Sequence, residues 1–125
     1  YLKAAAAEGV APAKCIAVED SASGVGSAGN ALIGLIVGYV GASHITPDAL
    51  DAHAAMLLLG AKSTNGIGAD IVLKDMEDLP ILVNHFLDLS LDEPERCAAR
   101  DFDFSVVKAQ LRDRCWLKAG AGGAA

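Results

Sequence analysis

The amino-acid sequence predicts an α/β domain with three layers, in which helices cover both faces of a parallel sheet. Two observations lead to this fold class. Short apolar runs typical of buried strands alternate with segments of helical pattern along residues 15–89. In addition, 53% of the residues are hydrophobic and only 5% are aromatic, so the core must consist mainly of aliphatic strands and alanine-rich helices.

Each expected element follows from a local pattern. Helices are expected where alanine or an amphipathic pattern dominates, and strands where short apolar runs occur. Ser21 or Ser23 is the expected N-cap of the second helix, and Thr46 with Pro47 that of the third. In chain order we expect a helix ending at Gly9, a strand over Cys15–Val18, a helix over Ser21–Ala31, a strand within Leu32–Val40, a helix over Thr46–Leu59, a strand over Asp70–Asp75 and a helix over Met76–Leu89.

The character of the sequence changes at Ser90, which suggests a division into two parts. Residues 1–89 carry the strand and helix alternation. Residues 90–125 begin with a charged run, continue with the helical pattern "SVVKAQLRDRCWLKA" and end in "GAGGAA". We therefore expect an appended helical tail whose last six residues are disordered.

Charge and composition restrict the partners of the protein. The formal net charge is −6, which disfavours nucleic acid and anionic membranes as partners. The longest apolar stretch, "ALIGLIVGYVGA", is too short to span a bilayer. The three cysteines, Cys15, Cys97 and Cys115, lack C-x-x-C spacing and indicate free thiols in a reducing compartment, so we expect a cytoplasmic protein.

The stretch "CIAVEDSASGVGSAGNA" contains two patterns with different chemistry. Gly24, Gly26 and Gly29 form a G-x-G-x-x-G, the pattern of a dinucleotide-binding turn, and Glu19 and Asp20 precede it. A dinucleotide site needs its first glycine directly after the strand. Here five residues intervene, and two of them are carboxylates that would repel a pyrophosphate. The pattern thus disfavours an oxidoreductase that binds a dinucleotide.

The acidic residues of this stretch fit a metal site better than a dinucleotide site. Glu19 and Asp20 directly follow an expected strand, and ligands of parallel α/β sheets gather at the carboxyl ends of the strands. Mg²⁺ takes one or two protein carboxylates, keeps several waters and binds phosphate oxygens. The two acids are therefore candidate magnesium ligands. The alternative is that both are solvated or cap the following helix.

The longer segment "PAKCIAVEDSASGVGSAGNALIGLIVGYVGASH" resembles the C-terminal part of haloacid dehalogenase-like phosphohydrolases, and most of all the branch containing β-phosphoglucomutase and small sugar-phosphate phosphatases. In that family the fourth motif is an acidic pair at a strand end, followed by serine and by Gly-Val in an alanine-rich helix. Glu19, Asp20, Ser21, Gly24 and Val25 match it residue by residue. "ADIVLKDMEDLPILV" resembles the last strand and closing helix of the family, so that the resemblance extends over roughly residues 1–87.

The resemblance implies a Rossmann-like fold and Mg²⁺-dependent hydrolysis of phosphate monoesters, or phosphosugar mutase chemistry, on a small phosphorylated metabolite. Glu19 and Asp20 would be the metal ligands. The nucleophilic Asp of a D-x-D motif, the Ser or Thr and the Lys of the family match no segment of this sequence. We therefore expect a fragment that is incomplete at its N-terminus and has no catalytic residue of its own. The alternative is an inactive remnant or interaction module.

A domain without its neighbouring strand would expose an apolar sheet edge. We therefore expect the chain alone to be associated or molten, unless the tail over residues 90–125 folds back over that edge.

Overall fold

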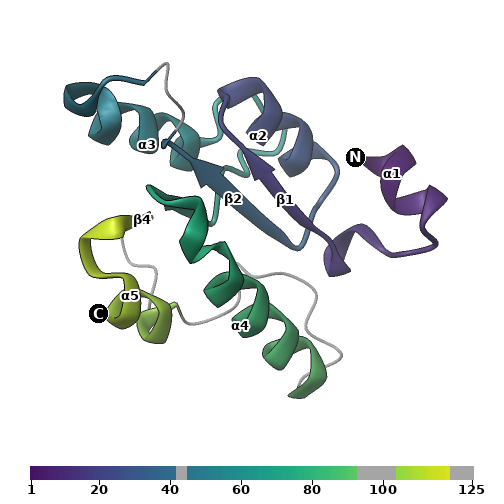
Figure 1. Ribbon diagram of the computed structural model, residues 1–125. Coiled ribbons are helices and arrows are strands. Elements are labelled where there is room, and N and C mark those ends of the chain that lie inside the picture. Colours follow the sequence, from purple (N-terminus) through teal and green to yellow (C-terminus); the bar gives the residue numbers. More distant parts are fainter. Residues whose placement is uncertain (42–44, 93–103, 119–125) are drawn as a thin grey trace.

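The computed structural model describes residues 1–41, 45–92 and 104–118 (Figure 1). The described helices and strands are α1 (Leu2–Ala7), β1 (Ile16–Glu19), α2 (Ala22–Asn30), β2 (Leu35–Tyr39), α3 (Leu50–Leu59), β3 (Ile71–Leu73), α4 (Leu79–Asp92), α5 (Ser105–Leu111) and β4 (Cys115–Leu117). Short 3₁₀ turns occupy Pro12–Lys14, Pro47–Ala49, Met76–Asp78 and Arg112–Arg114.

The strands form one sheet of four in the order β1-β2-β3-β4. β1, β2 and β3 are parallel, and β4 pairs with β3 in the antiparallel direction. Helices α2 and α3 lie on one face of the sheet, and α4 and α5 lie on the other (Figure 1). Alternate residues of β2 supply the two cores: Leu35 and Val37 face α4 and α5, whereas Ile36 faces α2 and α3. The predicted three-layer α/β architecture is therefore present, with a mostly parallel sheet.

Of the two expected N-caps, the one before α2 forms a side-chain hydrogen bond and the one before the third helix does not. The Ser21 side chain accepts a hydrogen bond from the backbone N–H of Gly24 at 3.1 Å, so Ser21 rather than Ser23 caps α2. Thr46 precedes a 3₁₀ turn that starts with Pro47, but its side chain makes no capping bond. The third helix therefore begins at Leu50, later than expected.

The tail is only partly helical, which corrects the prediction for residues 105–119. The helix ends at Leu111, where Arg112 takes a positive φ of 55° and turns the chain back toward β3. The next residues then alternate between faces as a strand does, because Cys115 packs in the core under α4 and α5 while Trp116 packs against the opposite core. The last six residues, expected to be disordered, lie outside the described part.

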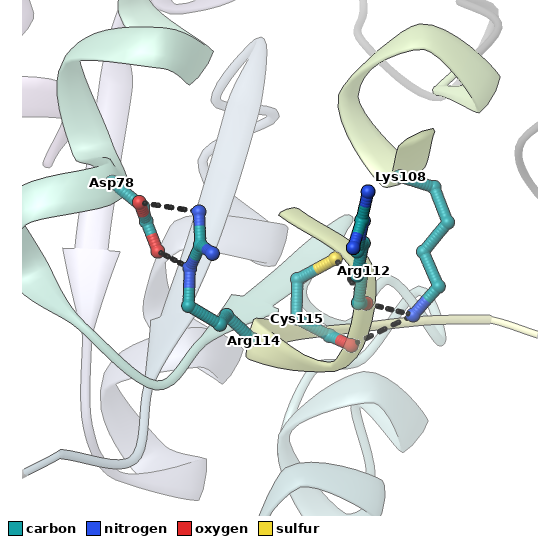
Figure 2. Close-up of polar contacts among 5 residues, drawn as sticks. All are labelled: Asp78, Lys108, Arg112, Arg114 and Cys115. Atoms are coloured by element: carbon teal, nitrogen blue, oxygen red, sulfur yellow. Dashed lines mark hydrogen bonds and ion pairs between the residues drawn. The ribbon is translucent and has the colours of Figure 1, made fainter. Parts of the chain in front are cut away.

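Polar contacts attach β4 to the elements around it (Figure 2). Arg114 forms a two-pronged ion pair with Asp78, with Nε to Oδ2 at 2.9 Å and Nη2 to Oδ1 at 3.3 Å. Hydrogen bonding to Asp78, followed by its charge, raises the pKa of Arg114. Lys108 of α5 donates to the backbone oxygens of Arg112 at 2.6 Å and Cys115 at 3.1 Å. These contacts join α5, β4 and the turn before α4.

Candidate metal site

Glu19 and Asp20 lie at the carboxyl end of β1, as the sequence predicts. Glu19 is the last residue of the strand and pairs in register with Gly38 of β2. The Glu19 side chain is half-buried, whereas Asp20 is exposed. The pair thus lies at the carboxyl ends of the parallel strands, which is where parallel α/β folds bind ligands.

Tyr1 and Gly24 lie next to the two oxygens of the Glu19 carboxylate. The Tyr1 hydroxyl donates a hydrogen bond to Oε1. The other oxygen lies over Gly24 in the first turn of α2, so close that a Cβ added at Gly24 would come within 2.5 Å of the carboxylate carbon. Burial, then the hydrogen bond to Glu19 and its negative charge, raise the pKa of Tyr1 above its ordinary range. One oxygen of the half-buried Glu19 carboxylate is therefore engaged by the Tyr1 hydroxyl, and the other lies against α2.

Asp20 is held through its backbone instead of its side chain. Its carbonyl oxygen accepts a hydrogen bond from Nε2 of His53, which belongs to α3, at 2.8 Å. Among the residues that the structure describes, no hydrogen bond or ion pair engages the Asp20 carboxylate. The Asp20 side chain is thus exposed, with a carboxylate that has no partner in the part of the chain that the structure describes.

The three glycines of the G-x-G-x-x-G pattern serve close packing. All three lie inside α2 instead of in a turn before it. A Cβ at Gly26 would lie 2.7 Å from the backbone carbon of Lys62, and one at Gly29 would lie 2.6 Å from the backbone oxygen of Ile67. Gly24 makes room for Glu19. The glycines therefore let α2 approach the segment between α3 and β3, and their arrangement does not form a phosphate-binding turn.

The acidic pair suits part of a magnesium site. Mg²⁺ needs six oxygen ligands, of which proteins often supply only one or two carboxylates, with water and phosphate completing the shell. Asp20 offers an open carboxylate, and Glu19 lies beside it. Over residues 1–41, 45–92 and 104–118, no three His, Cys, Asp or Glu side chains gather as a metal-binding group. Further ligands would have to come from water, substrate or other protein segments.

His53 is the site residue that sequence patterns miss. It contacts a loop 33 positions earlier in the chain, and no local spacing signals such a contact. His85 belongs to α4, its ring lies near that of Phe104, and its buried Nε2 has no partner among the described residues. His44 lies outside the described residues.

The described cysteines agree with the expectation of free thiols. Cys15 and Cys115 are both unpaired, and Cys97 lies outside the described residues. Burial raises the pKa of the Cys115 thiol. In the same part of the chain, the helices are too short or too polar for any of them to cross a membrane.

The fold has a counterpart in a solved structure. A conserved haloacid dehalogenase-like protein of unknown function from Agrobacterium tumefaciens is 32% identical to this chain, with a TM-score of 0.56. The match covers 69% of this chain and 33% of the Agrobacterium protein, so the chain corresponds to about one third of that protein's length. No protein-family model and no curated protein matches the chain. At this identity and similarity of structure, the chain has a haloacid dehalogenase-like α/β fold.

Proposed function

We propose that this chain supplies the magnesium-binding acidic pair of a haloacid dehalogenase-like phosphohydrolase. The whole protein would be a phosphatase or phosphosugar mutase that acts on a small phosphorylated metabolite. The observation that carries this proposal is the position of Glu19 and Asp20 at the carboxyl end of β1, in a fold shared with a haloacid dehalogenase-like protein. The sequence after the pair, with Ser21 as N-cap and Gly24 beneath Glu19, supports the same proposal.

The residues of this chain would bind and orient the cation. When bound, Mg²⁺ would neutralise charge on the phosphoryl oxygens of the substrate. Asp20 presents the open carboxylate, and Tyr1 and Gly24 fix the direction of Glu19. The nucleophilic carboxylate that the resemblance implies matches no segment of this sequence. We propose that another part of the whole protein contributes it, so that the chain represents a C-terminal fragment.

Thermal unfolding with and without Mg²⁺ tests the proposal. A cation that binds the folded state stabilises it by RT ln(1 + [L]/Kd), or about 2.7 kcal/mol at a hundredfold excess over Kd. We expect Mg²⁺ to raise the melting temperature of the wild-type chain and to have no such effect on Asp20→Asn. Asp88→Asn is the matched control, because it removes the same charge from an exposed position on α4. Equal Mg²⁺ responses in all three proteins would overturn the proposal.

An interaction module is the second candidate function. Within the described part of the chain, β1 pairs only with β2, so its other edge has no neighbour. A free strand edge can add a strand from another protein. This candidate would have no requirement for Mg²⁺, and a melting temperature independent of Mg²⁺ would favour it.

A further inference from the structure

The placement of His53 follows from how α3 crosses the sheet. One helical turn after His53, Leu57 packs directly over Gly38 of β2, where a Cβ would lie 3.0 Å from Cδ1 of Leu57. Gly38 is in register with Glu19. The same stripe of α3 therefore carries His53 to the turn that follows β1. The absence of a side chain at Gly38 thus lets α3 lie close to the sheet at this point.

The contact has a defined direction. Nε2 of His53 lies 2.8 Å from the carbonyl oxygen of Asp20. A carbonyl oxygen only accepts hydrogen bonds, so Nε2 must carry the proton and act as the donor. This bond connects the turn to α3, while the hydroxyl of Ser21 connects it to α2. The backbone of Asp20 and Ser21 is therefore fixed by one hydrogen bond to α3 and one to α2.

We propose that His53 is a positioning residue that fixes the backbone of Asp20 and thereby aims the acidic pair at a divalent cation. This inference rests on the proposed function. β1 is paired on one side only in the described part of the chain, so the turn after it receives little support from the sheet. Mg²⁺ demands near-ideal octahedral geometry, and small displacements of its ligands weaken binding. The hydrogen bond from His53 fixes the backbone of Asp20 and does not occupy its carboxylate, which can then bind the cation.

The test uses the ¹⁵N,¹³C-labelled 125-residue chain and Mn²⁺ as the probe, with binding followed by paramagnetic broadening of the NMR signals of residues 19–21. His53→Leu removes the donor, and His53→Gln keeps an N–H that can reach the same oxygen. Loss of a group that orients a metal ligand commonly costs 10–100-fold in affinity. We expect His53→Leu to weaken Mn²⁺ binding by about tenfold, and His53→Gln to retain most of the wild-type affinity. Asp20→Asn should abolish the localised broadening.

The outcomes separate the two proposals. If His53→Leu folds and binds Mn²⁺ as tightly as the wild type, the positioning role of His53 is wrong while the acidic pair stands. If the wild-type chain shows no broadening at residues 19–21, the proposed function fails. The contact itself is judged separately from the Asp20 carbonyl ¹³C and Ser21 amide shifts, which should move in His53→Leu and stay near wild type in His53→Gln. Unchanged shifts in His53→Leu would show that the contact is absent in solution.

Discussion

Gly24 shows how one missing side chain shapes the candidate site. Because Gly24 has no Cβ, the Glu19 carboxylate can lie against the first turn of α2. The N-terminus of a helix carries partial positive charge, which favours a carboxylate at this place. Tyr1 holds the other oxygen of Glu19 by a hydrogen bond. The direction of Glu19 therefore depends on two neighbours, Tyr1 and Gly24.

Substituting Gly24 by alanine separates helix stability from the position of Glu19. Alanine is favoured over glycine in a helix by about 1 kcal/mol. We expect Gly24→Ala to gain less than this, because the new methyl group displaces the Glu19 carboxylate, and to weaken Mg²⁺ binding by about tenfold. Ser27→Ala, at an exposed position of the same helix, should leave Mg²⁺ binding unchanged. Urea unfolding and Mg²⁺ titration of both variants would check this, and unchanged affinity in Gly24→Ala would contradict it.

Local sequence predicts only some of these contacts. Ser21 could be identified because a capping side chain bonds to a backbone N–H only a few positions away. The partners of the acidic pair come from farther away. Tyr1 is 18 residues from Glu19, and His53 is 33 residues from Asp20. Such contacts depend on how α1 and α3 pack on the sheet, and short-range patterns carry no information on that packing.

At the scale of elements, α5 and β4 complete the core on one face of the sheet. Leu111 of α5 and Cys115 of β4 are buried in the same cluster as Leu82 of α4. The sequence predicts α5 because its apolar residues have a helical period. It does not predict β4, whose three residues are too few to show a period of two. The strand forms because Arg112 turns the chain and the edge of β3 accepts it.

Truncation of Leu111 tests whether α5 contributes to the common core. Leu111 is fully buried, and removing a buried leucine side chain typically costs about 2–5 kcal/mol. We expect Leu111→Ala to lower the free energy of unfolding by this amount in one cooperative transition. Val106→Ala, at a position of α5 that is 58% exposed, should change it by less than about 1 kcal/mol. Similar effects of both substitutions would show that α5 is not packed as described.

At the scale of the whole molecule, the two edge strands of the described sheet differ in origin. The tail supplies one edge strand, β4, which pairs with β3, whereas β1 is the other edge strand. Ile16 and Val18 of β1 are only partly buried against the core. α3 also exposes apolar side chains, with Leu59 at 70% and Met56 at 38%. The tail thus forms the edge of the sheet that is farthest from β1, the strand that the acidic pair follows.

The open edge of β1 leads us to expect association of the chain when it is expressed alone. Unpaired strand edges and exposed apolar surface promote contacts between molecules. Light scattering and binding of a hydrophobic dye should detect oligomers, and these should persist in Leu59→Lys if the strand edge drives association rather than α3. A monomer by light scattering, with no dye binding in the native state, would contradict this expectation.

Anomalous diffraction from crystals soaked in Mn²⁺, as a substitute for Mg²⁺, tests the central claim most directly. The position of the acidic pair predicts a peak at the carboxyl end of β1, with a carboxylate oxygen of Asp20 bound directly to the ion. Glu19 should lie beside the ion, as a direct ligand or through a water. A saturating soak that gives no peak at Asp20, or an ion held by other residues, would contradict the assignment of Glu19 and Asp20 as metal ligands.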